Sequence, residues 1–210
     1  MTEPAGVTSP AGIILATRNP GKLAELRRIL AAAGVSAAVT GLDDVPGMPE
    51  VAETGRTFAE NALLKARAVA AFTGLPAVAD DSGLCVDVLN GMPGVLSARW
   101  SGSHGDDEAN LRLLLGQLAG VSAGGRGARF VCVAALVLPS GGEHLAEGTV
   151  RGRLTRSPRG SNGFGYDPIF VPDGFELTTA QMSAGEKDRI SHRGKALRAL
   201  APVIARELGS

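Results

Sequence analysis

The sequence has little of what defines several functional classes. Lysine plus arginine and aspartate plus glutamate both number 21, so the formal net charge is zero. The sequence has no excess of basic residues that would favour the wrapping of DNA or RNA. It also has no apolar run long enough to span a membrane. We therefore predict that the protein binds neither a nucleic acid polymer nor a membrane, and that any anionic ligand must meet a local cluster of cations.

Cysteines and targeting signals are also scarce. Cys85 and Cys132 are the only cysteines, and no CxxC motif or Cys/His cluster is present. We expect two buried free thiols in a reducing cytoplasm, with a disulfide or metal pair as the minor alternative. Residues 1–11 lack the basic and apolar parts of a signal peptide, so we expect a flexible leader before a single α/β domain over residues 12–210.

The order of strand and helix signals predicts an α/β fold with a mixed sheet. Gly12–Thr17 is a short apolar strand, and a helix capped by Asn19 follows it. Thr57 and Glu60 have the spacing of a capping box for a second helix, which Gly74 closes. The other expected elements are strands at Leu84–Val88 and Arg129–Leu138, a helix from Asp106 to Leu118, a hairpin turning at residues 140–142, and a terminal helix ending at Leu208.

Two adjacent carboxylates raise the first question about function. In "PAVADDSGLCVDV" an apolar run leads to Asp80 and Asp81 and then to Ser82-Gly83, which predicts the end of a buried strand. Each carboxylate disfavours ionisation of the other, so a cation is expected nearby, and Mg²⁺ is the leading candidate. The alternative is a solvated turn that caps the strand.

Cationic groups lie at or near two helix starts. The segment "TRNPGK" (Thr17–Lys22) offers backbone N–H groups and a lysine to an anion, although ordinary helix capping explains it about as well. It is not a Walker A loop, because the spacing GxxxxGK[ST] is absent. Asn61 and Lys65 lie four residues apart, hence on one helix face, with Glu53 in the preceding loop. Taken alone, Lys65 is more often a solvated surface lysine.

Aromatic and basic residues gather in two later segments. "GFGYDP" (Gly163–Pro168) holds Phe164 and Tyr166 in a Gly-rich loop, where they can stack on a base or plug the core. "EKDRISHRGK" (Glu186–Lys195) is the densest basic cluster, which we place around a helix start with Ser191 as N-cap. Together with the carboxylates, these groups indicate a site for a nucleoside triphosphate with Mg²⁺.

At these residues the chain closely resembles the Ham1-like inosine/xanthosine triphosphate pyrophosphatases. Five segments carry the resemblance in order, from Ile13 to Leu208: "ATRNPGK", "ETGRTFAENALLKA", "ADDSGL…GMPGVLSARW", "GFGYDPIF" and "EKDRISHRGKAL". The resemblance implies a long central mixed β-sheet flanked by helices, with two lobes, a substrate cleft between them and a homodimer. It also implies Mg²⁺-dependent hydrolysis of the non-standard purine nucleotides ITP, dITP and XTP to the monophosphate and pyrophosphate.

The resemblance further implies roles for individual residues. Asp81 would be the proton acceptor with Asp80 beside it, Lys22 and Lys65 would act on the phosphates, and Glu53 and Asp81 would bind the metal. The substrate-binding residues would be Thr17, Arg18, Asn19, Pro20, Gly21, Lys22, Ser82, Phe164, Gly165, Tyr166, Asp167, Lys187, His192 and Arg193. The residues from Phe164 to Arg193 in this set would form the base pocket.

Two positions depart from the family pattern. Arg18 stands where the family usually has glycine, and Trp100 stands where tyrosine is common.

Two rival functions are disfavoured by the same motifs. A non-catalytic nucleotide sensor would be expected to have lost the residues that bind the metal and the base, but this sequence retains them. A pyrophosphatase of the Maf type, which favours modified pyrimidine nucleotides, is disfavoured by the "SHRG" and "GFGYDP" segments. The sequence does not rank ITP, dITP and XTP.

Overall fold

The computed structural model describes residues 12–209, so the leader expected at residues 1–11 lies outside the described residues. The strands and α-helices are, in order, β1 (Gly12–Leu15), α1 (Pro20–Ala32), β2 (Ala38–Thr40), α2 (Phe58–Thr73), β3 (Ala77–Val86), α3 (Asp107–Gln117), β4 (Gly127–Val137), β5 (Glu143–Leu154), β6 (Phe170–Pro172), α4 (Ala184–Ile190) and α5 (His192–Leu208). Short 3₁₀ turns lie at Leu42–Asp44, Asp87–Leu89, Gly94–Arg99, Ala123–Gly125 and Asp167–Ile169. No helix within this part of the chain is long and apolar enough to cross a bilayer.

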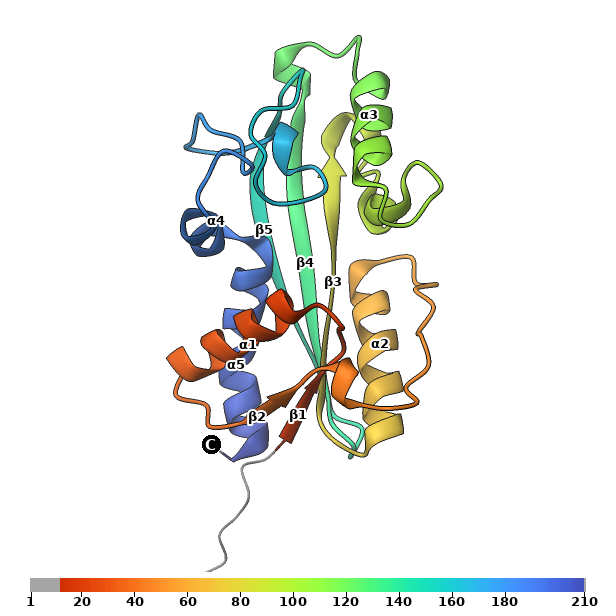
Figure 1. Cartoon of the computed structure of the whole chain (residues 1–210), viewed down its shortest axis with the longest axis vertical. Helices are drawn as coiled ribbons and strands as arrows, with labels where there is room; N and C mark the ends of the chain where they lie inside the picture. The colour runs from red at the N-terminus through yellow and green to blue at the C-terminus, as the bar shows by residue number, and fades with distance from the viewer. Residues whose placement is uncertain (1–11, 210) are drawn as a thin grey trace, which may run out of the picture.

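The six strands form one mixed sheet in the order β2-β1-β3-β4-β5-β6. β1 runs parallel to β2 and β3, whereas β3, β4, β5 and β6 are antiparallel to their neighbours. Figure 1 shows that β3, β4 and β5 run nearly the whole length of the molecule, with α1, α2 and α5 around their lower part and α3 beside their upper part. The two-lobed mixed sheet expected from the resemblance is confirmed.

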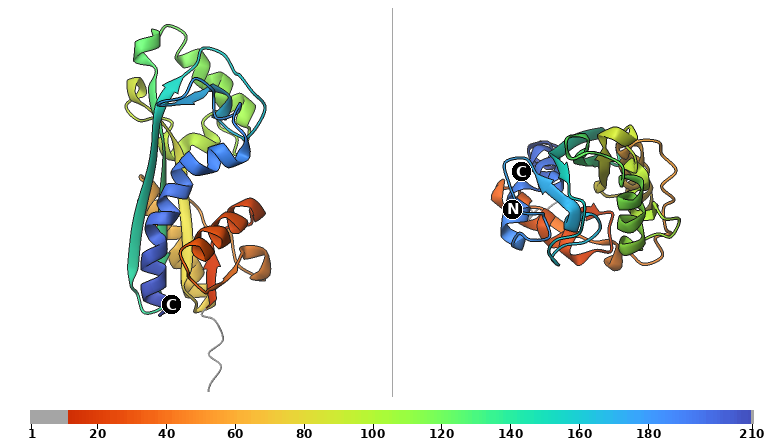
Figure 2. Two further views of the ribbon diagram at one scale, coloured as in Figure 1. Left: turned by 90° about the vertical axis from the view of Figure 1, so that its left-hand side faces the viewer. Right: turned by 90° about the horizontal axis from the view of Figure 1, so that it is seen from above.

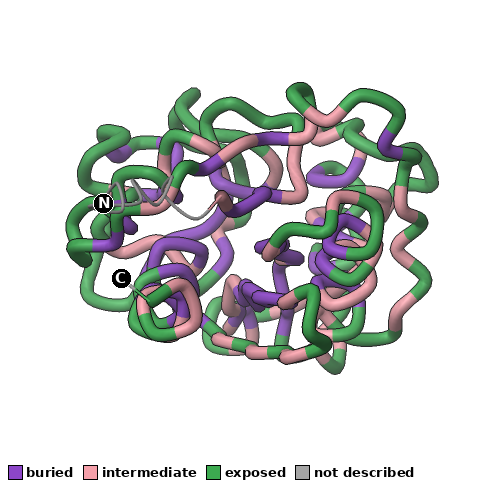
Figure 3. Tube along the Cα trace, turned by 90° about the horizontal axis from the view of Figure 1, so that it is seen from below, coloured by how far each residue is buried: buried purple, intermediate pink, exposed green. Residues whose placement is uncertain are grey.

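The sheet separates two apolar cores in the lower lobe, and a third core fills the upper lobe. α1 and α5 pack on one face, where Leu26 and Leu200 meet Val78 of β3. α2 packs on the other face, where Ala66 meets Ala79. The upper core gathers residues of β3, α3, β4, β5 and β6, and the side view in Figure 2 shows the two lobes stacked along the sheet. Figure 3 shows the buried residues where helices face the strands.

β3 differs from the sequence-based prediction. It is one strand from Ala77 to Val86, and Asp80, Asp81, Ser82 and Gly83 lie within it. The predicted strand end at Asp81, and the separate strand at Leu84–Val88, are therefore wrong. The physical reason is non-local, since β4 supplies backbone partners along all ten residues of β3.

The other edge of β3 is paired with β1 over only two residues. β1 pairs with β3 only at Ile14↔Ala77 and Leu15↔Val78. Among residues 12–209 no further strand pairs with that edge, and residues 92–97 cover its far end through Ser97 and Met92.

The predicted helix caps are confirmed, and one helix was missed. Asn19 caps α1, and Thr57 and Glu60 form the capping box of α2. The basic segment is divided between α4 and α5, with Ser191 as the N-cap of α5. α4 opens with its own capping box, Ser183 with Glu186, which is the local signal that the sequence reading overlooked. Both cysteines are buried and free, as expected.

Candidate functional site

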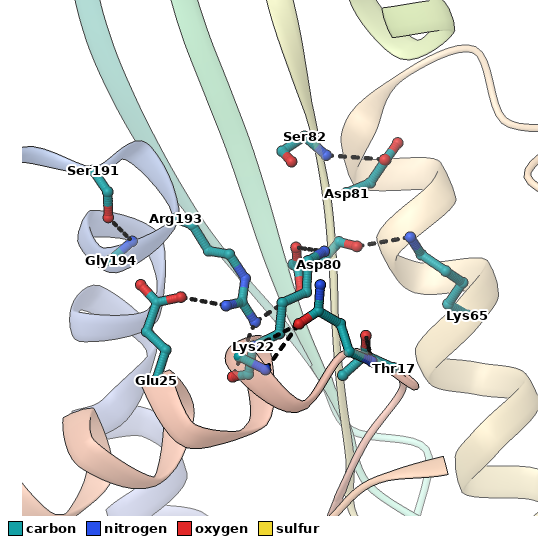
Figure 4. A network of polar contacts seen from close by, with 12 residues as sticks. Thr17, Lys22, Glu25, Lys65, Asp80, Asp81, Ser82, Ser191, Arg193 and Gly194 are labelled. Atoms are coloured by element: carbon teal, nitrogen blue, oxygen red, sulfur yellow. Dashed lines mark hydrogen bonds and ion pairs between the residues drawn. The ribbon is translucent and has the colours of Figure 1, made fainter. Parts of the chain in front are cut away.

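The candidate site lies at the open edge of β3, where the N-terminal ends of α1 and α5 approach one side of the strand and α2 approaches the other (Figure 4). Side chains alternate between the faces of a strand. Val78 belongs to the core beneath α1 and α5, and Ala79 belongs to the core beneath α2. Asp80 and Asp81 continue this alternation, so the two carboxylates lie on opposite faces of the sheet.

Asp80 is buried and ion-paired. Lys22 Nζ donates to its Oδ2 at 2.8 Å, and Arg193 Nη2 lies 3.2 Å from its Oδ1. Burial raises the pKa of Asp80, but the charges of Lys22 and Arg193 outweigh burial and hold that pKa well below its usual range. The cost of this buried charge is therefore offset by two side chains of the protein, whereas the sequence interpretation had assigned that task to Mg²⁺.

Asp81 is held by neutral donors. Asn61 Nδ2 donates to its Oδ2 at 2.9 Å, and the backbone N–H of Ser82 donates to its Oδ1 at 2.9 Å. Among residues 12–209, Asp81 takes part in no ion pair, unlike Asp80. Burial raises the pKa of Asp81, although Lys65 and Asn61 oppose the shift. A carboxylate in this setting can accept a proton or a metal ion.

Lys65 and Glu53 form a pair beside these carboxylates. Lys65 Nζ donates to Glu53 Oε1 at 2.6 Å and to the backbone oxygen of Asp80 at 2.7 Å. Arg99 adds a second cation, with Nη1 at 3.6 Å from Glu53 Oε2. Burial raises the pKa of Glu53, but Lys65 and Arg99 bring it below the usual value. Lys65 is thus part of the cleft and not a solvated surface lysine.

The carboxylates of Asp81 and Glu53 fit a Mg²⁺ ion that is bound together with a phosphate ligand. Within the described residues no group of three or more His, Cys, Asp or Glu side chains could by itself hold a metal ion. Mg²⁺ is usually held by one or two carboxylates together with phosphate oxygens and water. Asp81, whose carboxylate has no cationic partner here, and Glu53 supply that number of protein ligands.

The N-terminus of α1 is capped by its own side chains. Asn19 Oδ1 accepts from the backbone N–H groups of Gly21 at 2.9 Å and Lys22 at 3.2 Å, and Thr17 Oγ1 accepts from the N–H of Asn19 at 3.1 Å. Pro20 occupies the first turn. Ordinary helix capping therefore accounts for most of the hydrogen bonds in "TRNPGK". The group of this segment most available to a phosphate is the Lys22 ammonium, which in this structure donates to Asp80.

Arg18 lies on the surface beside this loop. Its Nη1 is 3.3 Å from Asp43 Oδ1, and the two side chains are 60% and 70% exposed. A pair this exposed contributes little to binding or stability.

A small hollow lies near the start of α5. Its lining residues are Phe130, Val150, Asp167, Phe170, Thr179, Lys187, Ile190, Ser191 and His192. The His192 ring stacks on Phe130 with ring centres 5.0 Å apart. Burial and the charge of Lys187 lower the pKa of His192 to about 4. At neutral pH the imidazole is uncharged, with one nitrogen as donor and the other as acceptor.

The aromatic loop divides its two rings between surface and core. Phe164 is 74% exposed, and Lys187 Nζ lies 4.9 Å from the centre of its ring. Tyr166 is buried in the upper core and donates its hydroxyl to the backbone oxygen of Ser97. Tyr166 therefore plugs the core, which is one of the two roles left open for these rings, and Phe164 is the exposed ring of this loop.

Asp167 holds the loop in place, and the loop is tied to α3. Asp167 is buried, accepts from the backbone N–H of Phe164 and the hydroxyl of Thr179, and pairs with Lys187. The N–H of Gly165 donates to the carboxylate of Asp107 at 2.8 Å.

Arg193, which the resemblance placed in the base pocket, does not line the hollow beside α5. Its guanidinium pairs with Glu25 and Asp80, and its Nε is buried with no hydrogen-bond partner among the described residues. The register of α5 on β5 brings it there, and this packing needs Gly148, where a Cβ would lie 2.0 Å from the backbone oxygen of His192.

Several residues of the site were missed by the sequence reading. They are Glu25, Arg99, Phe130 and Thr179, whereas Asn61 was noted beside Lys65 but was given no role. Asn61 had a local signal, since it lies one helical turn before Lys65 and faces the same strand. The others are brought in by tertiary packing, and local spacing does not reveal them.

The fold and the site define an α/β protein in which Lys22, Lys65 and Arg193 gather around Asp80 of the central strand, with Asp81 beside it. The sequence profile of the Ham1 family matches residues 13–203, and the chain belongs to the Ham1 family.

Relatives and solved structures agree with this membership over nearly the whole chain. The chain is 62% identical over 197 residues to the dITP/XTP pyrophosphatase of Streptomyces avermitilis, covering 94% of this chain and 98% of the relative. It is 61% identical over 196 residues to the dITP/XTP pyrophosphatase of Nocardia farcinica, covering 93% and 95%. The crystal structure of the nucleoside-triphosphatase or dITP/XTP pyrophosphatase of Mycobacterium abscessus is 57% identical, with a TM-score of 0.79 and coverage of 92% and 99%. The structure of the Staphylococcus aureus Ham1 protein is 39% identical, with a TM-score of 0.85 and coverage of 93% and 99%.

Proposed function

We propose that this protein hydrolyses ITP, dITP and XTP to the nucleoside monophosphate and pyrophosphate with the help of Mg²⁺. The observation that carries the proposal is the Asp81 carboxylate, which is oriented by two N–H groups, is free of ion pairs, and has Glu53 and Lys65 nearby. The relatives named dITP/XTP pyrophosphatase support the same activity.

Asp81 acts as the general base in this proposal. Its carboxylate takes a proton from water, and the water oxygen bonds to the α-phosphorus while the bond to the bridging oxygen breaks. The electron pair leaves with pyrophosphate. Lys22 and Lys65 stabilise the negative charge that develops on the phosphates. Lys22 must then exchange part of its contact with Asp80 for a phosphate oxygen.

Glu53 and Asp81 are the residues that would hold Mg²⁺. When bound, the ion neutralises charge on the phosphate oxygens and orients them. Lys65 and Arg99 already face Glu53, so this carboxylate stays ionised and ready to act as a ligand.

The base is proposed to stack on Phe164 and to meet hydrogen-bond donors near His192 and Lys187. Inosine and xanthine carry a carbonyl at purine position 6, where adenine carries an amino group. Donors accept the carbonyl, whereas the amino group leaves them unpaired, which is a strong basis for rejection. A contact from Arg193 to the base requires its guanidinium to leave Glu25 and Asp80 when the nucleotide binds.

We also propose that the protein is a cytoplasmic homodimer. The two free buried thiols support a reducing compartment. The dimer rests on the family resemblance. Light scattering coupled to size-exclusion chromatography should give twice the chain mass of 21.4 kDa, and a single-chain mass at micromolar concentration would contradict it.

A panel of nucleoside triphosphates with Mg²⁺ tests the activity. We expect pyrophosphate from ITP, dITP and XTP with kcat/KM values at least about 100-fold above that for ATP, because a hydrogen-bonding pocket can discriminate by this factor or more. Release of orthophosphate would contradict the site of bond cleavage. Equal rates for ITP and ATP would contradict the substrate class.

A further inference from the structure

Asn61 joins the loop before α2 to the cleft. Its side chain is completely buried, with 0% of the residue exposed. Its Nδ2 donates to Asp81 Oδ2 at 2.9 Å, and its Oδ1 accepts from the backbone N–H of Gly55 at 2.8 Å. A residue buried this deeply acts on a ligand only through its neighbours.

The backbone of Gly55 fixes which way round the Asn61 amide lies. A backbone N–H can only donate, so the amide atom that faces it is the oxygen, and the NH₂ group must face Asp81. The approach is close, because a Cβ at Gly55 would lie 2.6 Å from Asn61 Oδ1. The amide group of Asn61 therefore cannot flip, and Asp81 Oδ2 always faces its NH₂ group, which can only donate.

Asp80 and Asp81 are held by different chemistry. Asp80 is held by the cations of Lys22 and Arg193, which neutralise it. Asp81 receives one neutral N–H on each carboxylate oxygen, from Asn61 and from the backbone of Ser82. Two neutral donors fix the plane of a carboxylate without cancelling its charge.

We propose that Asn61 is a positioning residue that, anchored by Gly55, sets the orientation of the Asp81 carboxylate for its work on the reacting water. The inference rests on the proposed function, because it assigns Asp81 the role of proton acceptor. Residues that orient a reacting group from behind typically change activity 10- to 100-fold when removed, and a misplacement of about 1 Å can cost about 100-fold.

The variant Asn61→Ala tests the proposal by a split between kcat and KM. We expect kcat to fall about 10- to 100-fold, with KM within about threefold because the phosphate and base contacts remain. Asn110→Ala is the matched control. Asn110 is equally buried, lies in α3, and bonds to the backbone of Ala98 and Ser101. It should lower the melting temperature to a similar degree and leave kcat within about twofold.

A double-variant cycle with Asp81→Asn decides whether Asn61 acts through Asp81. Adding Asn61→Ala to Asp81→Asn should cause no further loss of kcat, because the group that Asn61 orients has already been disabled. Loss of the same factor in both backgrounds would overturn the proposal, as would wild-type kcat in Asn61→Ala alone. If Asn61→Ala does not fold, Asn61→Leu replaces it in the cycle, since leucine fills nearly the same volume and cannot donate to Asp81.

A structural readout separates this proposal from the proposed function. In a crystal structure of the Asn61 variant, the Asp81 carboxylate should adopt another rotamer, whereas an unchanged carboxylate would contradict the positioning role. An inactive wild-type protein would count against the proposed function, and the orientation of Asp81 would still decide the inference. An active wild-type protein with an equally active Asn61 variant would count against the inference alone.

Discussion

Asp80 and Asp81 are neighbours in sequence but lie on opposite faces of β3, and Asp80 alone of the two is in ion pairs. Asp80 faces α1 and α5 and is paired with Lys22 and Arg193. Asp81 faces α2 and is held by Asn61 and the backbone of Ser82. Alternation along a strand therefore gives two identical side chains different surroundings, one among cations and the other among neutral donors.

The first prediction separates the roles of these two carboxylates. Asp81→Asn should keep its fold and lose kcat by about 10²–10⁴, the usual range for a general base. Asp80→Asn should lose stability by about 3–5 kcal/mol, because it removes one partner of a buried ion pair. Steady-state kinetics and urea unfolding of both variants check this. Equal kinetic and equal stability losses for the two variants would contradict the division.

The second prediction concerns the departure at Arg18. Its pairing with Asp43 on the surface indicates a solvated side chain, so Arg18→Gly should leave KM within about twofold at low and high salt. Lys22→Met, which removes the ammonium paired with Asp80, should raise KM for all nucleotides. A salt-dependent rise of KM in Arg18→Gly would instead show that Arg18 contacts a phosphate.

The third prediction concerns the buried pairing of Arg193. Arg193→Met should lower the free energy of unfolding by about 3–5 kcal/mol, because Glu25 and Asp80 lose a shared partner. Arg28→Met breaks an exposed pair with Asp188 and should change it by less than about 1 kcal/mol. Denaturant unfolding measures both.

The same Arg193 variant tests whether this residue also reads the base. If it does so only after leaving its carboxylate partners, kcat/KM for ITP should fall far more than kcat/KM for ATP. Equal losses would restrict Arg193 to the structural role that its contacts here describe.

The fourth prediction concerns pH. The folded-state pKa of His192 is about 4, below the ordinary value of 6.5. Between these values the unfolded chain binds more protons than the folded one, so stability is full above about pH 6.5 and falls as the pH drops toward 4. His192→Gln should remove that part of the dependence, on the order of 1–3 kcal/mol. The exposed His104→Gln is the control, and parallel curves for wild type and His192→Gln would contradict the assignment.

Local sequence signals predicted the elements well where the deciding contacts are local. Asn19 capping α1, and Thr57 with Glu60 opening α2, are bonds between residues two or three positions apart, and both were predicted. α4 was not predicted, although its capping box of Ser183 and Glu186 is an equally local signal.

The limits of the sequence reading show at Tyr166 and Arg193. Both belong to segments that were correctly associated with the site, but Tyr166 turns into the upper core and Arg193 turns toward Glu25 and Asp80. A residue type and a motif do not tell which way a side chain points. Its orientation depends on the strands and helices packed against it.

By itself, the sequence determined the class of fold, the family and the group of residues around the cleft, because helix caps, strand patterning and ordered motifs are properties of short segments. Only the tertiary structure decided that β3 continues through Asp80 and Asp81, because β4, some fifty residues later, supplies its backbone partners. That continuity places the two carboxylates on opposite faces, where Lys22 and Arg193 contact Asp80 and Asn61 contacts Asp81, so that among residues 12–209 only Asp81 of the two is left without an ion pair.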